Sequence, residues 1–308
     1  MKFVLQFLLK ISFLASLMPY LISEKVFQKF EIRINPQVED SLYTSGKEMG
    51  LVDHKRIDEA SGLAYSRKYD NVLYTHNDSG GLPVLYQMDS TGKITREIAL
   101  DGADNRDWED IAIGPGRNKE KSYIYIGEIG DNKGVYPSIK LLRFEEPLPG
   151  QDKIEVKPEV TELTYPDGPK DAETLMVDPW NGDVYIVTKR DSSNVLYRLG
   201  AEDTEKEQAE LEKVLELPIT MSVGGDISPD GKEIIIKNYW VVYHWEREEG
   251  ESLVDALSRK PVQLPYVPEP QGEALAFGKD GNSYFSLSEQ RFRIKPILYQ
   301  YYKKPKTP

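Results

Sequence analysis

Cysteine is absent from this chain of 308 residues, so disulfides, thiolate catalysis and zinc sites with cysteine ligands are excluded. Histidine is scarce as well: His54, His76 and His244 lie far apart in the sequence. The 39 Lys and Arg residues are outnumbered by 51 Asp and Glu residues, which gives a net charge of −12. Because nucleic-acid backbones require a basic surface, we expect no nucleic-acid partner.

The common catalytic motifs are also missing. The chain has no G-x-S-x-G, no P-loop, no H-E-x-x-H and no G-x-G-x-x-G. Ser79 lies beside His76 and Asp78, but a catalytic triad needs residues that converge from different elements. Paired carboxylates could cleave a glycosidic bond, yet no aromatic-lined groove can be assigned. The sequence therefore identifies no reaction.

Only one long apolar run occurs, at residues 1–23, where Lys2 precedes a mostly apolar stretch. This pattern is typical of a secretory signal peptide, so we expect export to the periplasm, the exterior or the cell surface. The alternatives are a buried N-terminal helix or an uncleaved membrane anchor. Lys10 and Pro19 make the run a poor membrane span, and such an anchor is the only membrane contact we expect.

Five similar segments recur in residues 24–308, with starts roughly 50 to 64 residues apart. They read EASGLAYS, DWEDIAIGP, DAETLMVDP, SVGGDISPDG and QGEALAFGKDG, from residues 59, 107, 171, 222 and 271. Each precedes short strands rich in Val, Ile, Tyr and Phe, separated by turn residues. This spacing is typical of propeller blades, so we expect an all-β protein with one β-propeller domain.

We expect five blades, while a sixth built around residues 30–37 and a β-sandwich remain alternatives. The last repeat lacks a fourth strand, and the segment EMGLVDHKRI before the first repeat could supply it and close the ring. One stretch, EDTEKEQAELEKVLE at residues 202–216, resembles a charged surface helix within blade 3.

Polar residues form two columns at the starts of the five first strands. The outer column holds Glu59, Asp107, Asp171, Met221 and Gln271, and the inner column holds Ser61, Glu109, Glu173, Val223 and Glu273. Positions two apart in a strand share a face, and first strands line the channel of a propeller. The columns therefore predict oxygen ligands directed at the axis. The alternative is that these acids only cap loops.

Carboxylates a few ångströms apart repel one another unless a cation lies between them. Calcium binds six to eight oxygen ligands at ~2.3–2.6 Å, whereas zinc prefers histidine or cysteine. We therefore predict a calcium site, and its expected ligands are Glu59, Ser61, Asp107, Glu109, Asp171, Glu173 and Glu273. Met221 and Val223 leave blade 4 without such ligands.

The second strands should end beside the acids, because each forms a hairpin with a first strand. From these ends we predict a ligand site that contains His76, Asn77, Asp78, Asp131, Asn132, Lys189, Arg190 and Lys237. Lys and Arg beside a bound cation suit an anionic small molecule or a protein partner. For any single member of this set, a solvated loop residue is the alternative.

Several motifs together resemble a widespread group of exported bacterial β-propeller proteins of unestablished activity, sometimes labelled WD40-like or phytase-like. They are EASGLAYS, THNDSGG, NRDWEDIAIGP, IGEIGDN, YPDGPKDAETLMVDP, DISPDGKEIIIKNY and PQGEALAF, and the resemblance covers roughly residues 55–290. It implies the propeller but no catalytic residues. More distantly, the arrangement is similar to calcium-dependent apyrases and phytase propellers. We expect a calcium-stabilised propeller that binds a ligand or partner on its acidic face, with a calcium-dependent phosphate-ester hydrolase as the alternative.

Overall fold

The computed structural model describes residues 38–150, 153–291 and 294–305. Contacts divide the chain into residues 1–36 and 37–308, and the description below concerns the second unit alone. The predicted signal segment therefore lies outside the described residues. In the described part, no helix is long and apolar enough to cross a membrane.

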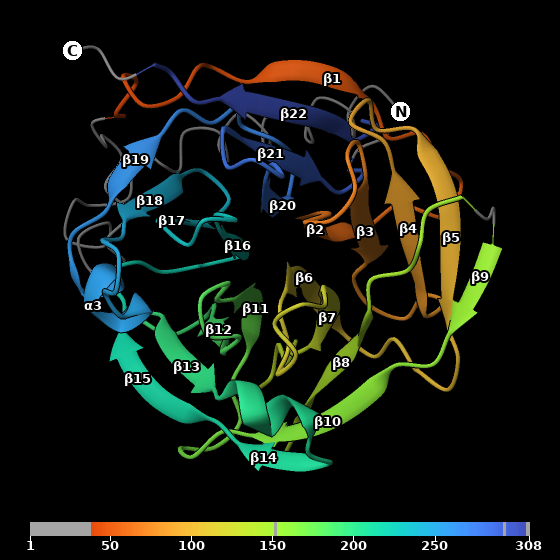
Figure 1. Ribbon diagram of the computed structural model, residues 1–308, viewed down its shortest axis with the longest axis vertical. Helices are drawn as coiled ribbons and strands as arrows, with labels where there is room; N and C mark the ends of the chain where they lie inside the picture. Colours follow the sequence, from red (N-terminus) through yellow and green to blue (C-terminus); the bar gives the residue numbers. More distant parts are fainter. Residues whose placement is uncertain (1–37, 151–152, 292–293, 306–308) are drawn as a thin grey trace, which may run out of the picture. The chain divides into compact units, whose positions relative to one another are not determined.

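Five sheets, each built on four antiparallel strands, surround a central axis, so the predicted five-bladed propeller is confirmed (Figure 1). The inner strands are β2 (Ala60–Tyr65), β6 (Trp108–Gly114), β11 (Ala172–Val177), β16 (Gly224–Ile227) and β20 (Gly272–Phe277). The second strands are β3 (Leu73–Asn77), β7 (Tyr123–Glu128), β12 (Val184–Thr188), β17 (Glu233–Lys237) and β21 (Ser283–Ser288). The third strands are β4 (Val84–Met88), β8 (Ile139–Glu145), β13 (Val195–Leu199), β18 (Val242–Glu246) and β22 (Ile297–Tyr302).

The fourth strands are β5 (Ile94–Leu100), β10 (Glu159–Thr164), β15 (Glu212–Glu216), β19 (Val262–Leu264) and, in blade 5, β1 (Lys47–Leu51). β1 pairs antiparallel with β22, so the N-terminal strand closes the ring as the sequence predicts. This pairing removes the unpaired edge that blade 5 would otherwise expose.

Two short strands add a fifth member to blades 1 and 2. β9 (Lys153–Val156) pairs in parallel with β5, and β14 (Gln208–Glu210) pairs in parallel with β10. Each comes from the connection within the following blade, so it links two neighbouring sheets. Neither strand was expected from the sequence.

The expected helix at residues 202–216 is wrong. A short 3-10 helix, η1 (Ala201–Glu205), is followed by β14 and β15. Strand pairing with blades 2 and 3 overrides the helical preference of the Glu- and Lys-rich stretch. An α-helix, α3 (Leu253–Ser258), instead lies between β18 and β19, and the hydroxyl of Ser252 caps it by accepting from Asp255 N.

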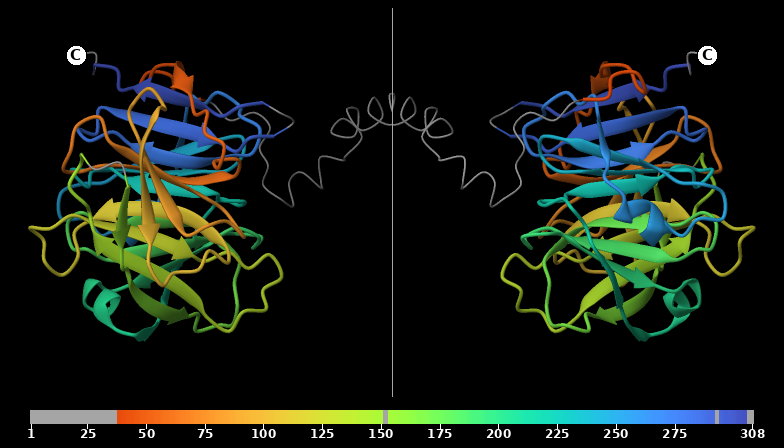
Figure 2. Two further views of the ribbon diagram at one scale, coloured as in Figure 1. Left: turned by 90° about the vertical axis from the view of Figure 1, so that its right-hand side faces the viewer. Right: turned by 90° about the vertical axis from the view of Figure 1, so that its left-hand side faces the viewer.

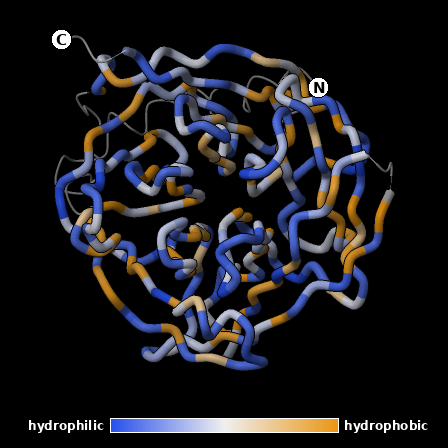
Figure 3. The backbone as a smooth tube through the Cα atoms, in the orientation of Figure 1, coloured by the Kyte–Doolittle hydropathy of each residue, from blue (hydrophilic) through white to orange (hydrophobic). Residues whose placement is uncertain are grey.

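Five hydrophobic clusters hold the ring together, and each fills the space between two adjacent blades. Hydrophobic residues accordingly recur in every blade (Figure 3). Trp108, which the sequence assigns to the core, is fully buried between blades 1 and 2. Burial between neighbouring sheets means that no blade can bury its apolar faces alone.

Two buried carboxylates also tie the inner strands together. Asp110 in blade 2 accepts from its own neighbour Ile111 N at 2.9 Å, from Leu175 N of blade 3 at 2.9 Å and from Gly225 N of blade 4 at 3.4 Å. It is fully buried, and burial raises its pKa well above the usual value. The channel is thus bridged by a side chain that satisfies backbone groups of three blades.

Asp226 in blade 4 makes the corresponding contacts to blades 5 and 1. Its carboxylate accepts from Phe277 N of blade 5 at 2.8 Å and pairs with Arg67 of blade 1 at 2.9 Å. Asp226 was outside both predicted acidic columns, and the contacts show that it stabilises the channel wall. Asp110 and Asp226 together contact groups of all five blades, and Arg67, just after β2, represents blade 1.

Candidate functional site

The acidic residues gather at the end of the channel where the inner strands begin. A repeated hydrogen bond explains this convergence, because in four blades an N–H just after the second strand donates to the carbonyl of the residue before the inner strand. The four bonds are Asp78 N to Glu59 O (2.9 Å), Gly130 N to Asp107 O (3.3 Å), Lys189 N to Asp171 O (2.9 Å) and Glu289 N to Gln271 O (3.2 Å). The two predicted sets of residues therefore meet at one end of the ring, which we name the acidic mouth.

A β-bulge shapes the start of four inner strands. The extra residues are Ser61, Glu109, Glu173 and Glu273, which are the predicted inner column. β16 of blade 4 pairs without a bulge and carries no carboxylate at this position. A bulge redirects a side chain out of the regular alternation. The inner column thus coincides with the bulges, which the regular strand alternation assumed for the two columns did not include.

Three carboxylates form the centre of the acidic mouth. Asp78, Asp107 and Glu109 each offer one oxygen, and these atoms lie within 4.8 Å of one another. Gly130 makes this possible, since a Cβ there would overlap Glu109 Oε1 and the carboxyl of Asp107. Two oxygens on opposite sides of one calcium ion are separated by about 4.8 Å, so a single ion can contact all three.

A second group of side chains continues around the mouth. Lys189 forms a buried ion pair with Glu173 and donates to the hydroxyl of Tyr239 at 2.9 Å. Tyr239 in turn donates to Glu273 Oε1 at 2.7 Å. Tyr239 comes from the β17–β18 loop of blade 4, so this phenol occupies the gap left by the missing carboxylate of that blade.

Asp171 faces a third group at the edge of the mouth. Its carboxylate accepts from Asp131 N at 2.9 Å and lies 2.5 Å from Arg190 Nε. Arg190 also contacts Asn132, and its side chain is 45% exposed. Four residues of the predicted sets are thus in direct contact here, and Arg190 presents a positive charge to solvent.

Other predicted residues have partners that leave them little freedom to bind a ligand. The hydroxyl of Ser61 donates to the carbonyl of Glu109 at 2.5 Å. His76 is fully buried against Trp108, with ring centroids 5.7 Å apart, and burial lowers its pKa to about 4. Lys237 is also fully buried, where it donates to Gly272 O and to Tyr266 Oη. Asn77 donates to Arg56 O at 2.6 Å.

Two further residues of the mouth, Tyr239 and Glu289, were not among those predicted from the sequence. Glu289 follows β21, is 2% exposed and pairs with Arg291 at 2.7 Å. Both residues lie in segments expected to converge on the mouth, but the motif alone did not distinguish them from their neighbours. Glu289 and Asp78 occupy equivalent positions in their blades, because the backbone N–H of each donates the repeated hydrogen bond. An alignment of the blades on this position would have identified Glu289.

Burial of these acids close to one another raises the pKa values of several of them. Burial, together with the charges of Asp107, Glu273 and Glu59, raises the pKa of Asp78 to about 7. Burial and the charge of Glu273 raise the pKa of Glu289 to about 8. The pKa values of Glu109 and Glu173 are raised well above the usual range, mainly by burial. A cation in the mouth would stabilise the ionised forms that burial disfavours.

Several oxygens in the mouth have no hydrogen-bond partner. Asp78 Oδ1, Asp131 Oδ1 and Glu173 Oε2 are buried without one. Such atoms are costly unless they meet a ligand. The histidines are used elsewhere: His54 faces Glu97 at 3.6 Å, and His244 lies 2.9 Å from Glu233. The donor set is therefore composed of oxygen atoms, which fits calcium better than zinc.

No family model matches the chain, and no curated protein matches it. Among solved structures it is similar to a PQQ-bound aldose sugar dehydrogenase from Streptomyces coelicolor, with 11% identity, a TM-score of 0.48 and coverage of 84% of this chain and 98% of that chain. It is also similar to regucalcin from Agrobacterium tumefaciens, described as a calcium-binding protein, with 12% identity, a TM-score of 0.46 and coverage of 86% and 97%.

A third similar structure is hydrazine synthase from Kuenenia stuttgartiensis, with 14% identity and a TM-score of 0.41. The match covers 76% of this chain but spans only 57% of the synthase chain. At such low identity, these likenesses concern the fold alone. The acidic mouth must therefore be interpreted from its own geometry.

Proposed function

We propose that the acidic mouth binds a calcium ion and that the calcium-loaded mouth binds an anionic ligand or a protein partner. The observation that carries this proposal is the group of three carboxylate oxygens within 4.8 Å of one another. The unpartnered Glu173 Oε2, on a side chain that is 5% exposed, supports it independently. Asp78, Asp107 and Glu109 would hold the ion, which would neutralise the mouth and offer a coordination position to an anion.

Exposed apolar side chains around the mouth support a binding role. The loops between second and third strands carry Leu82, Val135, Trp240 and Ile294, and these side chains are between 52% and 61% exposed. These loops follow the second strands, so they lie at the end of the ring where the acids gather. Large exposed apolar groups beside polar residues are typical of interaction surfaces.

Calcium binding can be measured by calorimetry on the chelator-treated protein. We expect binding in the wild type, and at least a tenfold weaker affinity in both Asp107→Asn and Glu109→Gln, because each removes a charged ligand. A hundredfold excess of calcium over its dissociation constant should stabilise the fold by ~2.7 kcal/mol.

The matched control is Asp101→Asn, an exposed acid in the turn after β5. It makes the same change in charge away from the mouth and should bind calcium normally. Unchanged calcium affinity in Asp107→Asn and Glu109→Gln would contradict the proposed site.

The second candidate function is calcium-dependent hydrolysis of phosphate esters. The exposed guanidinium of Arg190 beside the acids favours it, since arginine binds phosphate in a bidentate manner. Turnover of p-nitrophenyl phosphate or ATP that requires calcium, and that is lost in Glu109→Gln and Arg190→Ala, would support the enzyme. Calcium binding without turnover supports the binding protein.

We also propose that the protein is exported, on the basis of the apolar segment at residues 1–23. Fractionation of cells that express either the full chain or residues 24–308 tests this. The full chain should leave the cytoplasm and the shorter chain should remain there. Equal distribution of the two chains would contradict export through this segment.

A further inference from the structure

A separate cavity lies at the opposite end of the ring from the acidic mouth. Its volume is about 360 Å³, and it lies between the ends of inner strands β6, β11 and β16. The acids lie at the starts of these strands. β6 spans 7 residues, so the two ends are separated by about 20 Å. The loops that project from both faces of the ring are visible in Figure 2.

The floor of the cavity is apolar because the same sequence pattern recurs in three consecutive blades. A β-branched residue, one intervening residue and a proline occur at Ile113–Pro115, Val177–Pro179 and Ile227–Pro229. All six of these residues line the cavity, and the three β-branched side chains are at most 3% exposed. Prolines at strand ends present rigid rings without N–H donors, so this part of the wall is apolar.

Blade 1 places Arg67 at the position of these prolines, and the guanidinium also lines the cavity. Arg67 forms an ion pair with Asp226 and donates to Ile227 O at 2.9 Å, so its charge is already balanced within the ring. The acids at the other end are therefore separated from the cavity by a satisfied ion pair and by the Asp110 bridge.

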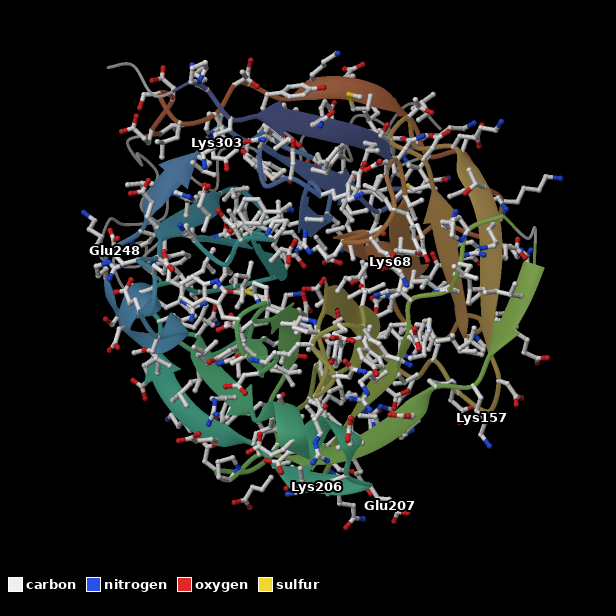
Figure 4. All side chains as sticks on the ribbon, viewed as in Figure 1. Lys68, Lys157, Lys206, Glu207, Glu248 and Lys303 are labelled. Carbon is white, nitrogen blue, oxygen red and sulfur yellow. The ribbon has the colours of Figure 1, made fainter. Side chains whose placement is uncertain are left out.

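The rim of the cavity is basic, in contrast to the chain as a whole. Lys68, Lys119 and Lys121 are exposed there, and Glu120 is the only acid among the residues that line the cavity. Lys121 pairs with Glu145 at 2.6 Å, but both side chains are nearly half exposed, so this pair is weak and can open. Lys68 lies beside the inner strands of the ring in Figure 4.

We propose that this cavity binds a small organic anion that has one flat apolar body and one anionic group. The apolar body would lie against the β-branched residues and prolines, and the anionic group would face the lysines of the rim. A volume of about 360 Å³ is in the range of small-molecule sites. This proposal does not depend on calcium binding at the acidic mouth.

Three naphthalene probes test the required chemistry by calorimetry on the full chain. Naphthalene-2-sulfonate should bind, whereas the neutral 2-naphthol and the cationic 2-naphthylmethylammonium should bind at least tenfold more weakly. Inorganic sulfate should bind more weakly than the naphthalene sulfonate, because it lacks the apolar body. Similar affinities for all three naphthalenes, or no binding of the sulfonate, would overturn the proposal.

Matched charge reversals locate the site. The double variant Lys68→Glu/Lys119→Glu should weaken sulfonate binding at least tenfold. The control Lys206→Glu/Lys213→Glu changes the net charge equally on blade 3, where Lys206 lies at the outer edge of the ring (Figure 4), and should bind as the wild type does. All four lysines are on the surface, and thermal melting should confirm that the variants fold.

A third variant tests whether sulfonate binding is independent of the acidic mouth. Asp107→Asn should retain sulfonate binding even where it loses calcium. Loss of sulfonate binding in the lysine control or in Asp107→Asn would place the probe elsewhere and refute the assignment.

Discussion

Asp110→Ala should lower the free energy of unfolding by about 3–5 kcal/mol, because it leaves three buried backbone N–H groups without an acceptor at roughly 1–3 kcal/mol each. Those groups belong to Ile111, Leu175 and Gly225, which lie on the inner strands of three blades. Loss of the carboxylate therefore weakens the ring where the strands approach most closely. Denaturant unfolding followed by circular dichroism measures the loss.

Two further variants make this prediction specific. Asp110→Asn retains one acceptor oxygen but places its NH2 group against a backbone N–H, where two donors face each other. Its stability should therefore lie between those of wild type and Asp110→Ala. Asp101→Ala removes an exposed acid and should change the stability by less than about 0.5 kcal/mol. If Asp110→Ala were as stable as Asp101→Ala, the bridge would have no part in holding the ring.

In the presence of chelator, the melting temperature should fall as the pH rises from about 5 to 8.5, and saturating calcium should remove most of this fall. The pKa values of Asp78 and Glu289 are raised to about 7 and about 8, so the folded protein holds these protons where the unfolded chain has lost them. Their stabilising contribution is complete below the unfolded pKa values, near 4, and is lost as pH rises through 7 and 8. Calcium replaces the protons and favours the ionised forms.

Glu233 affects the pH dependence of stability in the opposite direction, because its pKa is lowered in the folded protein. Its hydrogen bonds and charge interactions with His244 and Lys303 outweigh the effect of its burial and hold its pKa at about 2. Its contribution is therefore present above the unfolded value and is lost only as the pH falls toward 2. Without calcium, stability should therefore be greatest near pH 4.5, where the contribution of Glu233 is complete and that of Asp78 and Glu289 begins to be lost.

Glu109→Gln should flatten the pH profile in chelator, because the neutral amide removes one of the repelling groups. Its profile should also respond little to calcium. Two results would contradict the proposed coupling between protonation, calcium binding and stability. One is identical wild-type profiles with and without calcium, and the other is a melting temperature that rises between pH 5 and 8.5 in chelator.

The sequence predicts the ring well because its signal is periodic and local. Strand-forming segments recur at blade spacing, and the missing fourth strand of the last repeat predicts the pairing of β1 with β22. β9 and β14 could not be predicted in this way, because each is stabilised by a neighbouring blade rather than by its own pattern.

The site was predicted in outline, and its details depend on tertiary contacts. The columns place Asp107 and Glu109 correctly at one end of the channel, yet the bulge at Glu109 has no local sequence signature. His76 and Lys237 were selected because they lie at the ends of second strands, whereas burial depends on what packs against them. Tyr239 reaches its partners across two blades, and single-strand patterns do not contain that information.

The pairing of β1 with β22 joins residues near position 50 to residues near position 300. During translation, the first of these partners leaves the ribosome long before the second, so the last sheet stays incomplete until β22 has been synthesised. Because long-range pairing is slow and leaves strand edges exposed in the meantime, the third strand of blade 5 must form before the edge of β1 can be covered.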